Sequence, residues 1–430
     1  NERERLNLFG RIDWNINANH RLTLRTSTIK SDSSSVLRNS KTSFQFGNNG
    51  LVYTDRTIST VMQLDSVFGK NLTNQLLLGY QHIKDSPTYL GEPFPSLVIS
   101  GSGVTFTAGS EEYRHVNILK QDIIEITDNL TMFKGDHTLI LGTHNEFFNF
   151  YNAYVQRAFG KYEFKSIDDL ESGKPYKYDR YYSLTDDPNA PAKFWVYQFG
   201  LHAMDEWNVL PNLKLTIGLR ADIPIIPNDP PANDLVLAKF GIPTNQSASG
   251  NILWSPRLGF NYQLGENKEM QIRGGIGIFS GRAPYVWISN QFSNTGKDLG
   301  RYQINGVNPG DVPFFVTDPM AQPPNPAAKT TGDVNLIDKG FRFPQVMRTS
   351  IALDKNLPFG FTGTAEFVYS KNMKEVMFQN INLPEIPVGT SAAGLGSRPL
   401  YGTPSTSGSA ANGSPAYVNK DFRDVILLSN

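Results

Sequence analysis

The chain has 430 residues with 40 basic and 40 acidic side chains, so it lacks the basic excess typical of nucleic-acid-binding proteins. It contains no cysteine, which excludes disulfides, zinc–thiolate sites and cysteine nucleophiles. Charged residues make up 19% and aromatic residues 12%, an unusual balance for a soluble globular protein, yet no apolar run reaches the ~18 residues that a transmembrane helix needs.

The chain opens with segments that alternate between apolar and polar residues. In the first, Leu6, Leu8, Ile12 and Trp14 oppose polar neighbours, and Leu22 and Leu24 repeat the pattern after a short turn. The clearest later examples are residues 213–222 and 257–264. A period of two places alternate side chains on opposite faces of a β-strand, so the pattern predicts an all-β protein.

The connections between these strands alternate between short turns and long loops. Short polar turns are expected at residues 15–20, 69–72, 129–136, 208–212, 265–268 and 355–360. Long loops are expected at residues 31–52, 84–114, 149–193, 223–254, 281–344 and 372–421. Soluble sandwiches and propellers also contain alternating strands, but loops longer than about 12–15 residues are uncommon in them. The rhythm instead favours a transmembrane antiparallel up-and-down β-barrel, with short periplasmic turns and long extracellular loops.

This architecture assigns a role to each face of the strands. In a bilayer the apolar face meets lipid, and polar residues such as Arg220, Arg257 and Arg273 line the lumen. Trp195 and Trp207 fall on one face near opposite ends of one strand, and Trp14 ends the first strand. Twelve residues of strand span about 40 Å, which at ~40° tilt approaches the apolar band plus its interfaces. We therefore expect these tryptophans in the interfacial girdles, although ordinary core positions are the alternative.

A glycine-rich segment, RGGIGIFSGRAPYVWISNQ at residues 273–291, could in principle cradle a phosphate. A dinucleotide fingerprint needs a third glycine that is misplaced here, and a Walker loop needs a Gly-Lys-Ser/Thr ending that is missing. Pro284 and the β-branched and aromatic residues after it also argue against a helix at 285–288. The segment is interpreted as a strand whose lumen-facing Gly275 and Gly277 leave room for something bulky, before a loop begins near Gly281.

Catalytic motifs are not recognisable in the sequence. The six histidines are dispersed without metal-ligand spacing, and no Gly-x-Ser-x-Gly motif occurs. We expect neither an enzyme nor a bound metal or cofactor.

Three stretches resemble the barrel of TonB-dependent outer-membrane receptors, and most closely their Oar-like group. They are WSPRLGFNYQL, QIRGGIGIFSGRAPYVWISNQ and GFRFPQVMRTSIALDKNLPFGFTGTAEFVYSKNMKEVMFQNINLP, and the opening NLFGRIDWNINANHRLTLR is similar too. The resemblance implies a barrel of roughly 22 strands in the outer membrane of a Gram-negative bacterium. It also implies a plug domain, energy coupling through TonB and energy-coupled uptake of a bulky extracellular ligand.

About twelve strands are recognisable, and the final DFRDVILLSN resembles the start of another. We therefore expect residues 1–430 to be an internal part of the barrel domain, with the plug domain, the TonB box and the C-terminal strands outside this chain. A passive porin, a structural or adhesin barrel, and a secretion-linked role remain alternatives. Arg282, Tyr285 and Trp287 at the root of the longest loop are the candidate residues for ligand or plug contact, unless they only anchor the loop at the rim.

Overall fold

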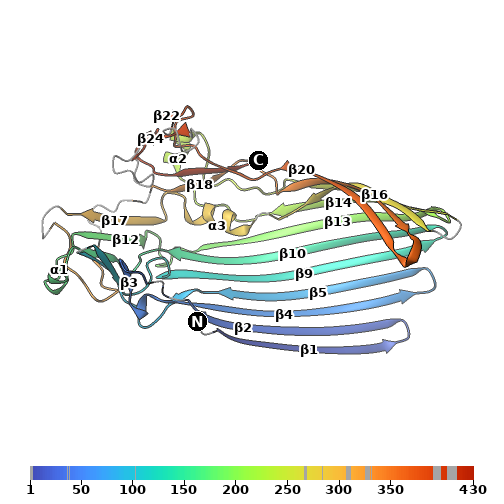
Figure 1. The fold of residues 1–430 in the computed structure, drawn as a ribbon, viewed down its shortest axis with the longest axis horizontal. Coiled ribbons are helices and arrows are strands. Elements are labelled where there is room, and N and C mark those ends of the chain that lie inside the picture. Colours follow the sequence, from blue (N-terminus) through green and yellow to red (C-terminus); the bar gives the residue numbers. More distant parts are fainter. Residues whose placement is uncertain are drawn as a thin grey trace.

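Twelve long strands form one curved antiparallel sheet, in which each strand pairs with its neighbours along the chain (Figure 1). The computed structural model describes residues 3–35, 37, 39–101, 103–265, 269–282, 284–306, 311–324, 330, 332–390, 399–403 and 414–430. The strands are β1 (Arg3–Asn17), β2 (His20–Ser34), β4 (Leu51–Phe68), β5 (Leu72–Asp85), β9 (Val116–Lys134), β10 (His137–Val155), β13 (Ala192–Leu210), β14 (Leu213–Ile225), β15 (Leu253–Leu264), β16 (Met270–Ser280), β19 (Gln345–Asn356) and β20 (Thr362–Lys374). The prediction of about twelve barrel strands is confirmed.

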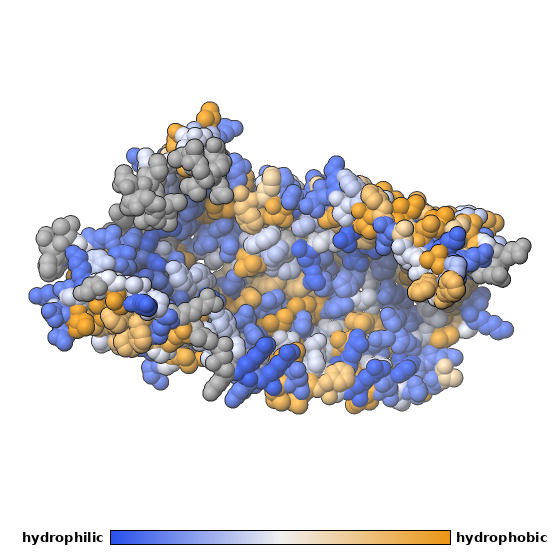
Figure 2. Space-filling view, viewed as in Figure 1, coloured by the Kyte–Doolittle hydropathy of each residue, from blue (hydrophilic) through white to orange (hydrophobic). Residues whose placement is uncertain are grey.

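The two faces of this sheet differ as the alternation predicts. Large apolar side chains on the convex face are exposed, including Leu6, Leu8, Ile12, Leu24, Ile58, Leu141, Leu201, Ile217, Leu258 and Ile351. Trp14, Trp195 and Trp207 lie on this face, 58%, 37% and 36% exposed, as girdle residues require. Figure 2 shows the surface in mixed colours, with hydrophobic residues gathered at the upper right over β16 and β20. The concave face, here called the lumen wall, carries the polar residues.

Short turns join the strands at one end and long loops at the other (Figure 1). Gly69 (φ 67°) and Gly135 (φ 59°) adopt left-handed backbone conformations that close two of the turns. The turn expected at 129–136 is shorter, because β9 continues to Lys134. The turn expected at 265–268 lies mostly outside the described residues. Both chain ends lie on the side of the long loops.

The long loops build a second, mixed sheet, which we call the loop sheet. It has the order β17-β12-β11-β7-β8-β3 and therefore joins four loops that are distant in sequence. Its strands are β3 (Ser43–Gln45), β7 (Ser96–Gly101), β8 (Val104–Ala108), β11 (Lys161–Phe164), β12 (Lys177–Ser183) and β17 (Leu299–Asn305). Tyr162, Phe164 and Tyr178 are fully buried between them. Along the chain, the helix η1 (Gly47–Asn49) follows β3, and the helix α1 (Ile167–Glu171) lies between β11 and β12.

A third, three-stranded sheet forms from β18 (Val334–Ile337), β26 (Val425–Ser429) and β21 (Met377–Asn380). The strand expected at the end of the chain is therefore present as β26. It pairs with β18 and β21, and not with a strand of the twelve-stranded sheet. Val236 of α2 (Asp234–Phe240) is buried against this sheet. The remaining short elements are β6 (Thr88–Tyr89), η2 (Pro358–Gly360), β22 (Gly389–Thr390), β23 (Pro399–Leu400), β24 (Gly402–Thr403) and β25 (Ser414–Pro415).

The expectation of no helix at 285–288 is wrong, since α3 spans Tyr285–Ser293. Pro284 stands at its N-cap, where a missing N–H costs nothing. Ile288 and Phe292 are buried against other elements. Tertiary packing of this kind outweighs the modest helix propensity of β-branched and aromatic residues.

The twelve-stranded sheet is open along two edges in the part of the chain that the structure describes. β1 pairs only with β2, and β20 pairs only with β19. Lipid cannot satisfy such edges, so a complete barrel needs further strands beside them. No helix among the described residues is long and apolar enough to cross a bilayer.

Candidate ligand site at the barrel mouth

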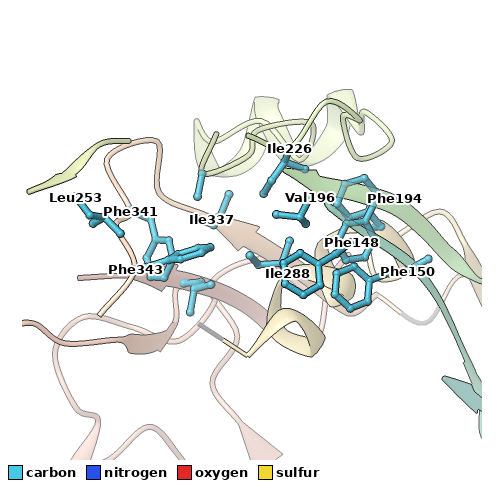
Figure 3. Packing of buried hydrophobic residues seen from close by; sticks show 14 residues of the cluster. Phe148, Phe150, Phe194, Val196, Ile226, Leu253, Ile288, Ile337, Phe341 and Phe343 are labelled. Atoms are coloured by element: carbon cyan, nitrogen blue, oxygen red, sulfur yellow. The ribbon is translucent and has the colours of Figure 1, made fainter. Parts of the chain in front are cut away.

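The loop between β16 and β19 folds back against the lumen wall at the loop end of the sheet. Its helix α3 packs on β13, and the contact is almost entirely apolar. Figure 3 shows Ile288 of α3 beside Phe148 and Phe150 of β10, with Phe341 and Phe343 further along the same layer. We call this layer the mouth cluster; it comprises Phe148, Phe150, Ala192, Phe194, Val196, Ile226, Ala248, Leu253, Ile288, Phe292, Ile337, Phe341, Phe343 and Leu428.

Arg282 connects the start of the loop to the lumen wall. Its Nη1 donates a hydrogen bond to Oε1 of Glu146 at 3.0 Å, and its guanidinium lies 5.5 Å from the ring centre of Phe148. Glu146 is almost fully buried, with 10% of its side chain exposed, and His144 Nε2 lies 3.5 Å from its other carboxylate oxygen. Arg282 therefore neutralises a carboxylate that would be costly to bury alone.

Tyr285, in the first turn of α3, packs against β10 and β13. Its ring centre lies 5.0 Å from those of Phe148 and Phe150, and its hydroxyl donates to Oε1 of Gln198 at 3.2 Å. Burial raises the pKa of the Tyr285 hydroxyl, so it stays a protonated donor. Gln198 itself is buried and lies on the lumen wall.

Trp287 contacts a different neighbour. Its ring meets Phe378 of β21 edge to face, with 5.0 Å between ring centres. On the wall side of the helix, Nδ2 of Asn152 donates to Oγ of Ser289 at 2.6 Å. Arg282, Tyr285 and Trp287 thus all hold the loop in place, and their contact with a ligand or plug stays a prediction.

Gly275 and Gly277 of β16 lie on the lumen wall beside β15. A Cβ at Gly275 would meet the carbonyl oxygen of Leu258 at 2.7 Å, so no side chain fits between these two backbones. A Cβ at Gly277 would meet the side chains of Arg257 and Phe279 at 3.2 Å. Together with Gly259, these glycines line a hollow of about 750 Å³. The strand interpretation is therefore confirmed, and what fills the hollow is a prediction.

Cationic side chains surround this hollow. Arg257, Arg273 and Arg348 line it together with Glu366. Nε of Arg273 donates to Oδ2 of Asp354 at 2.9 Å, whereas the guanidinium of Arg257 lies 4.7 Å from the ring centre of Phe279. The described residues hold no group of three or more side chains arranged as a metal site. The wall here is suited to polar or anionic contacts.

Sequence reasoning missed the wall partners Glu146 and Gln198. Both occupy lumen-facing positions, but Phe148 and Phe194 on the same face interrupt the alternation near the mouth. This local break in an otherwise polar face was the signal available in the sequence. Apolar residues on a lumen wall need a covering element, so the break indicates that a loop segment packs there.

Comparison with known protein families shows which family has this architecture. One family, described as the outer membrane beta barrel domain, matches residues 1–419. The chain belongs to this family. No curated protein matches it.

Solved structures of similar fold include an outer membrane transporter and a siderophore receptor. The outer membrane transporter YddB from Escherichia coli is 12% identical over 98% of this chain and 42% of its own, with a TM-score of 0.55. FpvA of Pseudomonas aeruginosa, solved with bound pyoverdine and iron, is 12% identical over 88% of this chain and 43% of its own, at 0.51. The siderophore receptor PirA from Acinetobacter baumannii is 11% identical over 100% of this chain and 48% of its own, at 0.50.

This outer-membrane β-barrel chain spans less than half the length of those three structures. Family and fold confirm the predicted antiparallel membrane barrel and its location in the outer membrane of a Gram-negative bacterium. The resemblance to TonB-dependent receptor barrels is confirmed at the level of the fold, while the Oar-like group stays a prediction.

Proposed function

We propose that this barrel belongs to a TonB-coupled receptor that imports a bulky extracellular ligand. The supporting observation is the position of α3, which covers the lumen wall at the mouth. A ligand passing along this wall would have to displace α3 first. A passive porin needs no such movement, so docking of α3 favours a gated importer.

Order in the extracellular loops supports ligand capture. Arg157 bonds Asp179 at 2.5 Å and Glu112, and Arg301 bonds the same Asp179 at 2.6 Å. Burial alone would raise the pKa of Glu112, but Lys161 and Arg157 lower it overall, so the carboxylate stays charged. A loop sheet held by buried ion pairs can present a fixed surface to a ligand.

Energy coupling in this proposal requires partners outside the chain. The plug would contact the lumen wall, where the hollow over Gly275 and Gly277 offers space beside Arg257. TonB would act on that plug from the periplasm. Arg282, Tyr285 and Trp287 would then change partners when α3 leaves the wall.

Two measurements on the full-length protein test this proposal. The purified protein should bind the periplasmic domain of TonB and should show no open-channel current in a planar bilayer. A steady open channel without TonB binding would establish a passive porin. A protein that neither binds TonB nor conducts current would favour an adhesin or structural barrel, and this result would also overturn the proposal.

A further inference from the structure

Four polar side chains lie together on the lipid-facing side of β5, β9 and β10, among the apolar residues of that face. They are Asn74, Asp128, Thr143 and Asn145. Strand register places Asp128 directly opposite Thr143. Nδ2 of Asn74 donates to Oδ1 of Asp128 at 2.7 Å, and Nδ2 of Asn145 donates to Oγ1 of Thr143 at 2.8 Å. We call these four residues the membrane polar patch.

The membrane polar patch includes a carboxylate near the middle of the apolar band. Register continues from Asp128 to Thr143 and on to Leu201, which lies halfway between Trp195 and Trp207 along β13. A tilt of ~40° displaces matched positions on adjacent strands by about 3 Å along the membrane normal. Asp128 therefore lies within about 6 Å of the depth of Leu201, well inside an apolar band of about 25 Å.

The strands that complete this barrel would not reach the membrane polar patch. β5, β9 and β10 each pair with a neighbour on both sides, so further barrel strands would add beside β1 and β20. A plug would occupy the lumen, and the long loops lie beyond the ends of the strands (Figure 1). Either lipid or another membrane protein therefore meets this face.

Hydrogen bonds inside the chain satisfy the membrane polar patch only in part. Among the residues that the structure describes, Oδ2 of Asp128 accepts no hydrogen bond, and one amide hydrogen of Asn145 has no acceptor. Hydrocarbon offers neither donors nor acceptors, so polar atoms at this depth are costly unless a partner group meets them. The patch thus presents one free acceptor and one free donor to the membrane.

We propose that the membrane polar patch is the contact between two copies of this barrel, related by a two-fold axis along the membrane normal. The free amide hydrogen of Asn145 in one copy donates to Oδ2 of Asp128 in the other, and symmetry forms the reciprocal bond. Asp128 and Asn145 are diagonal neighbours on adjacent strands, about 7–8 Å apart, so the two bonds fit side by side. The patch is complementary to itself, which favours a second copy over an unrelated membrane protein.

Apolar side chains beside the membrane polar patch would pack in the same contact. Leu141 precedes Thr143 on the lipid-facing side of β10, and Leu201 is its register partner on β13. Phe199 is the register partner of Asn145. All three apolar side chains are exposed in the single chain. Close packing of this kind, together with hydrogen bonds, drives association between membrane segments, because lipid tails are as apolar as the side chains.

Native mass spectrometry of the full-length protein in mild detergent tests this proposal, and we expect a dimer. Asn145→Asp places carboxylates opposite each other twice and should weaken dimerisation about thirty-fold. The swapped variant Asp128→Asn/Asn145→Asp should restore the dimer, because the donor and the acceptor only change sides. Its new amide oxygen can still accept the hydrogen bond from Asn74. Mobility on unheated gel electrophoresis shows that each variant is folded.

Thr26→Leu/Thr60→Leu is the matched control, because it removes another hydrogen-bonded polar pair from the lipid-facing side, on β2 and β4. This variant should dimerise like the parent protein. A monomeric parent protein would overturn the proposal, as would a dimer that Asn145→Asp leaves unchanged or that the swapped variant fails to restore. Association with a different membrane protein in place of a second copy would overturn it too.

Discussion

Arg282 and Glu146 form the one ion pair described between the α3 loop and strand β10, with 3.0 Å between Nη1 and Oε1. Glu146 is nearly buried, whereas Arg282 is half-exposed. The pair therefore combines an inward carboxylate with a cation that solvent can still reach. The pair fixes the loop two residues before Phe148 of the mouth cluster, so disturbing it should loosen α3 without unfolding the barrel.

Glu146→Gln should increase local opening of α3. Loss of an ion pair whose cation is half-exposed costs about 1 kcal/mol, which corresponds to roughly five-fold faster hydrogen exchange in α3. Hydrogen exchange of residues 285–293 measures this directly, with exchange in β4 as the internal reference. Unchanged exchange in α3 would show that the pair does not hold the loop.

Tyr285 allows its ring and its hydroxyl to be tested separately. Tyr285→Phe removes only the bond to Gln198 and should cost about 1 kcal/mol of docking free energy. Tyr285→Ala also empties the space between Phe148 and Phe150 and should cost about 3–4 kcal/mol. Hydrogen exchange of α3 should rank the variants in this order, and equal effects would contradict the packing described.

Gly275 and Gly277 should respond differently to alanine. Gly275→Ala places a methyl group against the backbone of Leu258 and should destabilise the barrel by about 1–3 kcal/mol. Gly277→Ala meets only side chains that can move, so its effect should be smaller. The temperature at which the purified full-length protein unfolds on gel electrophoresis compares the two. The reverse order would refute a backbone contact at Gly275.

His115 makes the loop sheet sensitive to acid. Its Nδ1 accepts the N–H of Phe159 at 3.0 Å, and its Nε2 lies 3.1 Å from the carbonyl oxygen of Ser110, so the bonds fit a neutral ring. Burial lowers its pKa to about 4, below the unfolded value of about 6.5. The contribution to stability is therefore complete above pH ~6.5 and is lost as the pH falls toward ~4, on the order of 3 kcal/mol.

Hydrogen exchange of residues 94–115, corrected for the intrinsic effect of pH, measures this loss. His115→Gln should remove the pH dependence in that window while leaving the effects of Glu111 and Glu112 in place. An identical pH dependence in the variant would assign the effect to those carboxylates.

The sequence predicted the barrel sheet well, because period-two alternation reports directly which face meets lipid. Leu213, Leu215 and Ile217 show this on β14. The loop sheet was not predicted, since Tyr162 and Tyr178 are brought together by loops distant in sequence. Pairings of this kind leave no local pattern.

The mouth was predicted only in part. Arg282, Tyr285 and Trp287 lie at the start of the loop, where each contacts another element, and their contact with a ligand or plug stays a prediction. The helix that carries Tyr285 was missed, because its stability comes from packing on Phe148 and Phe194 and not from local propensity.

Cysteine labelling in living cells tests most directly whether energised transport moves α3. The chain has no cysteine, so Ser289→Cys introduces one buried site on α3, and Val286→Cys introduces an exposed control on the same helix. With TonB active, both should react with a membrane-impermeant maleimide; without TonB, only Val286→Cys should react quickly. Equal labelling of Ser289→Cys with and without TonB would contradict a TonB-driven gate at the barrel mouth.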